Sequence, residues 1–312
     1  MCCLFGLIDY GHTLSGKQKS YIISTLATVC EARGTDATGI AYNSGGQLRI
    51  YKRPVPAHKL KFRIPNDASV IMGHTRMTTQ GSEKKNYNNH PFRGTAGGKP
   101  FALAHNGVLH NDILLRRELH LPKTSIETDS FIGVQLIERQ RTLGFESLRA
   151  MAEKVEGAFT FTVMDDLDAL YIIKGDNPMC LCHFPKRRFY LYASTEEIMG
   201  LTLRCLGLTS EKPRKVPACC GDILRIGHGG EITNGTFNTS FLLQYRYASY
   251  CAPFYHPQTN KTAGRAKANR TYLDELKSFS MSFGYSPEEI DALADQGYEP
   301  EEIEEILYCG WT

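Results

Sequence analysis

The first 230 or so residues alternate short apolar runs with amphipathic stretches, and this alternation limits the possible folds more than any other feature of the sequence. Apolar runs of four to six residues predict buried strands, and apolar positions three and four residues apart predict helices. We expect strands over residues 4–8, 48–51, 70–73, 101–104, 159–164, 170–173, 189–192 and 223–226, and helices over 18–32, 130–141 and 195–206. Such a mixture is typical of sheets covered by helices.

Composition excludes several other classes of protein. A hydrophobic fraction of 42% over 312 residues is ample for a core, and a net charge of +3 is too small to indicate nucleic-acid binding. No apolar stretch approaches the roughly 20 residues that span a bilayer, and the N-terminus lacks a signal-peptide pattern. The ten cysteines lack the paired CxxC spacing of a zinc site. We therefore expect a cytoplasmic protein with no metal, no membrane contact and no nucleic-acid partner.

The end of the chain differs in charge from the rest. The glycine-rich segment 227–230 interrupts the strand and helix pattern, and five basic residues with no acidic one follow between 237 and 273. From 274 onward there are eleven acidic residues and one lysine, Lys277. We predict three parts: a main domain over 2–228, a linker or docking strap over 229–272, and an acidic helical repeat over 273–312.

The acidic part contains a short internal repeat. The segment 284–290 recurs thirteen residues later as 297–303, and each copy places Pro and two Glu after a polar residue. Proline at the first helical position and acids in the first turn are typical of a helix start. We predict helices over about 287–295 and 300–308, which either pack on the main domain or serve as a module for a partner.

Cys2 combines two reactive groups if Met1 is removed. Its thiol and its free α-amine, with ordinary pKa values of about 8.5 and 7.7 to 8.0, would then lie on one residue. N-terminal nucleophiles use such an amine as the base for their own side chain. A cysteine at position 2 proves nothing alone, so the interpretation depends on the rest of the chain.

Several separated segments resemble one known pattern. Their order and spacing are similar to those of class II glutamine amidotransferases, the N-terminal-nucleophile family. The segments are Cys2–Gly6, Arg33–Ile40, Gly73–Gly81, Asn88–Phe92, His105–Gly107 with Asn111, Glu127–Ser130, Tyr192–Glu196 and Gly221–Ile223. The resemblance implies an α+β fold, a four-layer αββα sandwich, to which this chain adds a small C-terminal helical appendage.

The resemblance also assigns roles to individual residues. It implies Cys2 as nucleophile and α-amine base, Asn106 and Gly107 as the oxyanion hole, and Arg76, Thr79, Gln80 and Asp129 as glutamine-binding residues. These residue types suit glutamine. A guanidinium grips a carboxylate with two hydrogen bonds, a carboxylate binds the ammonium, and fixed donors stabilise the charge that develops on the amide oxygen.

The sequence departs from the family pattern at four positions. Met77 replaces a Trp, Gln80 replaces a His, Phe131 replaces an acid, and Cys3 replaces Gly or Ser. Met77 predicts a more loosely closed pocket because Met is flexible, and Cys3 has no α-amine and is expected to be a spectator. We expect the three histidines of these motifs to be structural: His90 as a loop anchor, and His74 and His105 as buried polar groups.

The predicted reaction is hydrolysis of glutamine to glutamate and ammonia through a γ-glutamyl thioester, which needs no cofactor. No nucleotide or phosphate motif follows the predicted domain, so we expect the ammonia to pass to a separate acceptor enzyme or subunit. Two alternatives stay open: an amidohydrolase of another γ-glutamyl or small amide, and a non-catalytic glutamine-binding or scaffolding protein.

Overall fold

The computed structural model describes residues 2–240, 242, 273, 276, 277, 280, 285–298 and 303. The chain divides into two compact units, Met1–Cys251 and Ala252–Thr312. No helix in the described ranges is both long enough and apolar enough to cross a membrane. Each unit is considered by itself.

The first unit contains two antiparallel sheets. Within the described residues, seven strands form the first sheet, and β1 lies near its centre between β10 and β4. In spatial order the strands are β11 (Arg214–Val216), β9 (Cys180–Phe184), β10 (Phe189–Ala193), β1 (Cys3–Ile8), β4 (Val70–Arg76), β2 (Ala37–Ser44) and β3 (Gln47–Arg53). All six residues of β1 are buried, because both its edges and both its faces are covered.

The second sheet has six strands in the described part of the chain. In spatial order they are β13 (Ile232–Thr236), β12 (Asp222–Ile226), β8 (Leu170–Lys174), β7 (Gly157–Met164), β6 (Lys99–Leu109) and β5 (Phe92–Ala96). β13 pairs with β12 along its whole length. The sheet therefore extends past residue 228, where the sequence placed the end of the domain.

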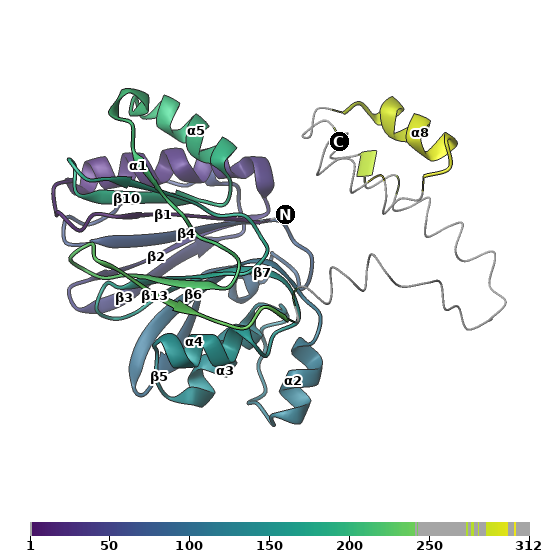
Figure 1. Cartoon of the computed structure of the whole chain (residues 1–312), viewed down its shortest axis with the longest axis horizontal. Helices are drawn as coiled ribbons and strands as arrows, with labels where there is room; N and C mark the ends of the chain where they lie inside the picture. Colours follow the sequence, from purple (N-terminus) through teal and green to yellow (C-terminus); the bar gives the residue numbers. More distant parts are fainter. Residues whose placement is uncertain are drawn as a thin grey trace. The chain divides into compact units, whose positions relative to one another are not determined.

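The two sheets stack face to face between two layers of helices (Figure 1). The first sheet is covered by α1 (Gly16–Val29) and α5 (Glu196–Cys205), and the second by α2 (Asp112–Glu118), α3 (Phe131–Gln140) and α4 (Phe145–Ala152). One core cluster fills each sheet–helix interface, and a third, which includes Leu4, Met72 and Ala104, fills the space between the sheets. This arrangement confirms the predicted α+β, four-layer αββα sandwich.

Local signals explain where the first helix begins and ends. Ser15 caps α1 by accepting a hydrogen bond from the backbone of Gln18, and the Gln18 side chain accepts one from the Ser15 backbone. This capping box satisfies two backbone N–H groups that the helix leaves unpaired. The helix ends earlier than predicted and continues as a 3₁₀ turn, η1 (Cys30–Arg33), which carries Arg33 to the end of the first sheet.

All the strands predicted from apolar runs are present, but several others escaped that criterion. β2, which was not predicted, contains Gly39, Asn43 and Ser44, and it is a strand because it pairs with β3 and β4. β3 was predicted in part, over 48–51, and extends to Gln47–Arg53. The predictions also missed β5, β9, β11 and β13 and the helices α2 and α4. The other short 3₁₀ helices are η2 (Ala57–Lys59), η3 (Asn86–Asn88) and η4 (Thr209–Glu211).

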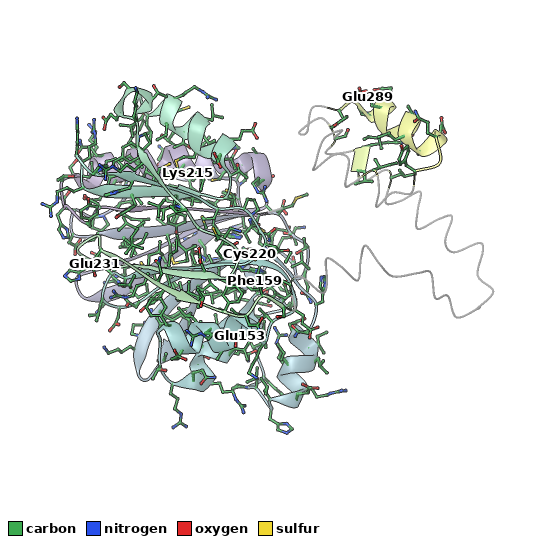
Figure 2. The ribbon with its side chains drawn as sticks, viewed as in Figure 1. Glu153, Phe159, Lys215, Cys220, Glu231 and Glu289 are labelled. Carbon is green, nitrogen blue, oxygen red and sulfur yellow. The ribbon has the colours of Figure 1, made fainter. Side chains whose placement is uncertain are left out.

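The helical layers bury large aromatic side chains. Phe159 of β7 is fully buried between the second sheet and its helices, and it packs against Phe161 and Phe237 (Figure 2). Phe237 lies beyond β13. The core of the first unit therefore uses residues that the sequence analysis assigned to a linker.

The second unit contains α8 (Pro287–Asp295), which matches the first predicted repeat helix. Ser286 caps it through a capping box with Glu289, and Pro287 occupies the first turn. Ile290 and Leu293 are buried against Leu276 and Ile303. The second predicted helix, 300–308, and most of the predicted strap, 229–272, lie outside the described residues.

Candidate active site

A small cleft lies at the end of β1, and five separate segments of the chain line it. Cys2, directly before β1, is part of the lining. The segment after β4 contributes Met77, Thr79 and Gln80, and the turn before α3 contributes Thr128, Asp129 and Ser130. Arg76, His90, His105 and Gly107 complete the lining. Six of the seven predicted site residues therefore line one cleft: Cys2, Arg76, Thr79, Gln80, Gly107 and Asp129.

Cys2 is positioned by the central strand that follows it. Cys3 pairs with Thr75 across β1 and β4, so Cys2 lies beside the end of β4, where Arg76 stands. The Cys2 thiol donates to the Met77 carbonyl at 3.4 Å, and the Cys2 carbonyl accepts from Arg33 Nε at 3.0 Å. Burial raises the pKa of the Cys2 thiol. The sulfur is therefore protonated near neutral pH, and it needs a base to become a nucleophile.

Cys3 faces the opposite way. Its side chain is fully buried in the cluster between the first sheet and its helices, 3.0 Å from the sulfur of Cys30. Successive side chains of a strand point to opposite faces, so two adjacent cysteines cannot both reach the cleft. This geometry agrees with the expectation that Cys3 is a spectator.

Arg76 is almost fully buried, and its guanidinium is held from two sides. Nη1 donates to Asn89 Oδ1 at 2.7 Å, while Nη2 donates to the carbonyls of Gln80 at 2.6 Å and Gly81 at 3.3 Å. Five N–H donors are available on a guanidinium. Among the described residues, Nε–H and one hydrogen of Nη1 have no acceptor, so donors remain for a ligand in the cleft.

Asp129 begins the turn into α3 and is also held by backbone groups. Its Oδ2 accepts from Leu109 N at 2.7 Å, and its Oδ1 accepts from Ser130 Oγ at 3.3 Å. The Asp129 N–H donates to Gln80 Oε1 at 2.9 Å. Gln80, predicted to bind substrate, thus uses its side-chain oxygen to join the loop after β4 to this turn.

Gly107 is at a position where only glycine fits. Its φ is +144°, and a Cβ atom there would lie 1.9 Å from the carbonyl oxygen of Ala158 on β7. Any side chain would break the pairing of β6 with β7 at the wall of the cleft. Strand packing therefore requires glycine at this position, which also lines the cleft.

Asn106 is the one predicted residue that does not line the cleft. Its side chain is buried and its Nδ2 donates to Ser194 Oγ at 3.4 Å, a long hydrogen bond. Ser194 Oγ also accepts from Leu4 N at 2.8 Å. Ser194 thus links Asn106 to the strand that carries Cys2. Ser194 belongs to one of the matched segments, Tyr192–Glu196, but the resemblance assigned it no role.

The three histidines form a buried group beside the cleft. His74 Nε2 donates to the His105 carbonyl at 2.9 Å, and burial lowers the pKa of His74 to about 3. His105 Nδ1 lies 2.8 Å from Ser130 Oγ, and burial lowers its pKa too. The His90 ring packs 4.1 Å from that of His74 and 4.4 Å from that of Phe92. All three are therefore neutral at pH 7.

Lys52 is a second residue that the motifs did not identify. It lies on β3, and its ammonium donates to the carbonyls of Asn89 and Pro91. Burial and the nearby charge of Arg76 lower the pKa of Lys52 to about 8. A search for apolar runs does not single out a lysine on an edge strand. Only the three-dimensional structure shows that Lys52 forms hydrogen bonds to the segment that contains His90.

Lys52 predicts a pH dependence of stability. Between pH 8 and the ordinary lysine pKa of about 10.4, the unfolded chain binds a proton that the folded chain has lost, so stability rises with pH. We expect this effect to raise the free energy of unfolding of wild type by about 1–3 kcal/mol between pH 7.5 and 10, and we expect Lys52→Met to lack this rise. Urea unfolding at the two pH values measures it. Lys99→Met, at an exposed position, is the control; if wild type and Lys52→Met change in parallel, the prediction is wrong.

Comparison with curated proteins found relatives that match part of this chain. No protein-family model matches the chain. The glutamine–fructose-6-phosphate aminotransferase (isomerizing) of Bacillus thuringiensis is 33% identical over 157 residues, which are 48% of this chain and 26% of that protein. The protein of the same name from Staphylococcus epidermidis is 30% identical over 189 residues, 57% of this chain and 30% of that protein. The chain thus spans less than a third of the length of these curated relatives.

A solved structure has the same fold as the first unit. The glutamine phosphoribosylpyrophosphate amidotransferase of B. subtilis, solved with ADP and GMP, gives a TM-score of 0.61 at 18% identity. The match covers 77% of this chain and 50% of that one. At this identity the likeness concerns the fold alone, and it agrees with the two stacked sheets described above.

Proposed function

We propose that the first unit of this chain is a class II glutamine amidotransferase domain that hydrolyses the side-chain amide of glutamine. One observation carries the proposal. A thiol (Cys2), a guanidinium (Arg76) and a carboxylate (Asp129) come from three distant segments and line the same small cleft. Glutamine presents an amide, a carboxylate and an ammonium, which are the chemical complements of these three groups.

The proposed nucleophile is the thiol of Cys2, and the proposed base is its own α-amine, freed by removal of Met1. The raised pKa of the thiol makes this base necessary, because little thiolate is present at pH 7. An α-amine with a pKa of about 8 accepts the proton as sulfur attacks the amide carbon. The buried histidines are less suited to this role, since burial lowers the pKa of each.

The substrate is proposed to lie between Arg76 and Asp129. The guanidinium of Arg76 binds its carboxylate, and Asp129 binds its ammonium. Thr79 adds a hydroxyl at the carboxylate end. Gln80 acts mainly through its hydrogen bond to the Asp129 backbone, which fixes the distance between the two charged groups.

The tetrahedral intermediate places a negative charge on the former amide oxygen. We assign its stabilisation to the backbone N–H of Gly107 and to the side-chain amide of Asn106. The long hydrogen bond from Asn106 to Ser194 is weak enough for Nδ2 to exchange it for the oxyanion. Ammonia then leaves with the proton held by the α-amine, and water hydrolyses the γ-glutamyl thioester to glutamate and restores the thiol.

The ammonia is proposed to pass to a separate acceptor enzyme. The names of the matched relatives describe an aminotransferase that uses glutamine and fructose 6-phosphate, in which the amide nitrogen has an acceptor. Ammonia released in the cleft of this chain would likewise need an acceptor. The acceptor is thus the main partner to be identified.

Intact mass and turnover test the proposal together. We expect the purified protein to lack Met1, to release equal amounts of glutamate and ammonia from glutamine, and to gain one adduct on Cys2 with 6-diazo-5-oxo-norleucine. Preference for other γ-glutamyl amides would instead favour a different amidohydrolase. Retained Met1 with neither adduct nor turnover would favour a binding or scaffolding protein.

A further inference from the structure

Asn89 contacts Arg76, is not among the residues that line the cleft, and is fully buried. Its Oδ1 accepts from Arg76 Nη1 at 2.7 Å. Its Nδ2 donates to the Glu83 carbonyl at 2.8 Å and lies 3.3 Å from Asn86 Oδ1. Because a carbonyl can only accept, the contact with Glu83 fixes which end of the Asn89 amide faces Arg76.

The backbone of Asn89 is held as firmly as its side chain. Its carbonyl accepts from the ammonium of Lys52, and its N–H donates to the Asn86 carbonyl at 3.2 Å. The neighbouring Asn88 is tied to Glu127 in both directions, through its Oδ1 and its Nδ2. Hydrogen bonds to its backbone and to its neighbour therefore fix the position of Asn89 beside Arg76.

An uncharged acceptor has a particular consequence at this place. A carboxylate beside Arg76 would form an ion pair with it and would compete with the carboxylate of a ligand. An amide oxygen orients the guanidinium but leaves its charge uncompensated. Of the acceptors that the structure gives Arg76, all three are neutral: the Asn89 amide and the backbone carbonyls of Gln80 and Gly81.

We propose that Asn89 is a positioning residue that sets the orientation of Arg76 for the α-carboxylate of the substrate without neutralising its charge. The proposal rests on the function proposed above, and it concerns substrate affinity and not the chemical step. It predicts that changes at Asn89 alter the KM for glutamine and leave kcat nearly unchanged, because Cys2 and Gly107 do not contact Asn89.

Two variants test the two parts of this proposal. Asn89→Ala removes the oriented acceptor and is expected to raise the KM for glutamine about 10- to 30-fold, with kcat within about threefold of wild type. Asn89→Asp keeps the size and an acceptor oxygen but adds a negative charge. We expect it to raise KM at least as much as Asn89→Ala, because its carboxylate competes with the substrate. A wild-type KM in Asn89→Asp would overturn the part of the proposal that concerns charge.

A pair of labelling reagents separates positioning from loss of structure. The reaction of Cys2 with 6-diazo-5-oxo-norleucine requires recognition of an α-carboxylate, whereas its reaction with iodoacetamide does not. Peptide mass mapping is expected to show that Asn89→Ala slows the first reaction about tenfold and the second less than twofold. Equal slowing of both would mean that the variant disturbs the cleft in general, and the proposal would be wrong.

Asn43→Ala is the matched control. Asn43 is also a buried asparagine, but its Nδ2 donates to Asp165 and Asp168, away from the cleft-lining residues. We expect it to leave KM and both labelling rates at wild-type values. If wild type itself neither hydrolyses glutamine nor reacts with the glutamine analogue, the proposed function fails. If wild type does both and the Asn89 variants match it, only the role of Asn89 is refuted.

Discussion

Cys2→Ala is expected to abolish glutamine hydrolysis, with kcat reduced by about 10⁴-fold or more. The variant keeps the α-amine but has no atom that can form the thioester, and no other cysteine in the described part of the chain lines the cleft. The cysteine next to it, Cys3, is fully buried on the opposite face of β1, 3.0 Å from Cys30. Ammonia and glutamate release, measured in parallel with circular dichroism, separates this loss from unfolding.

Cys3→Ala is the matched control for this experiment. It removes a thiol one residue away, and we expect kcat to change less than threefold, with a stability loss of about 1 kcal/mol from the small cavity. The assignment of the nucleophile fails if both variants lose activity equally, or if Cys2→Ala retains turnover.

Arg76→Lys is expected to raise the KM for glutamine about 100-fold or more. An ammonium is a point charge and cannot make the two parallel hydrogen bonds of a guanidinium. It also cannot reach Asn89, Gln80 and Gly81 at the same time, as Nη1 and Nη2 of Arg76 do. The variant therefore loses both the direct contact with the substrate carboxylate and part of the support for the loop after β4. Initial rates over a wide range of glutamine concentration measure the effect.

The control for this variant is Arg93→Lys on β5, where Arg93 is exposed and donates to the Leu48 carbonyl at 3.3 Å. We expect its KM to equal that of wild type. An unchanged KM in Arg76→Lys would place the carboxylate site elsewhere. A fall in thermal stability without a change in KM would show that Arg76 supports the loop only.

The sequence predicted the chemistry of the cleft better than its detailed geometry. Cys2, Arg76, Gly107 and Asp129 belong to segments whose residue types and order are distinctive, and the structure places all four on one cleft. Asn106 shows the limit of this approach. Its position in a motif predicted an oxyanion donor, but its side chain contacts Ser194, which directly follows β10 of the other sheet.

The secondary structure also includes elements that the sequence predicted and elements that it did not. Apolar runs predicted the central strands β1, β4, β7 and β10 because these are buried on both faces. β3, with its alternating exposed and buried residues, was predicted only in part, and β13 not at all. Both are end strands of their sheets, and each is stabilised by pairing with the strand that precedes it in the chain. Their exposed polar residues interrupt the apolar runs on which the predictions were based.

By itself, the sequence determined the capped helix at 287–295, because that depends on residue type and short-range spacing. Its resemblance to a known family implied the α+β class and the residues that carry the proposed chemistry. Only the tertiary structure decided that Cys3 faces the core, that Gln80 holds Asp129, and that Lys52 and Asn89 support Arg76. These contacts join segments 13 to 49 residues apart. Strand register and the stacking of two sheets create them, and neither is encoded in any single stretch of the chain.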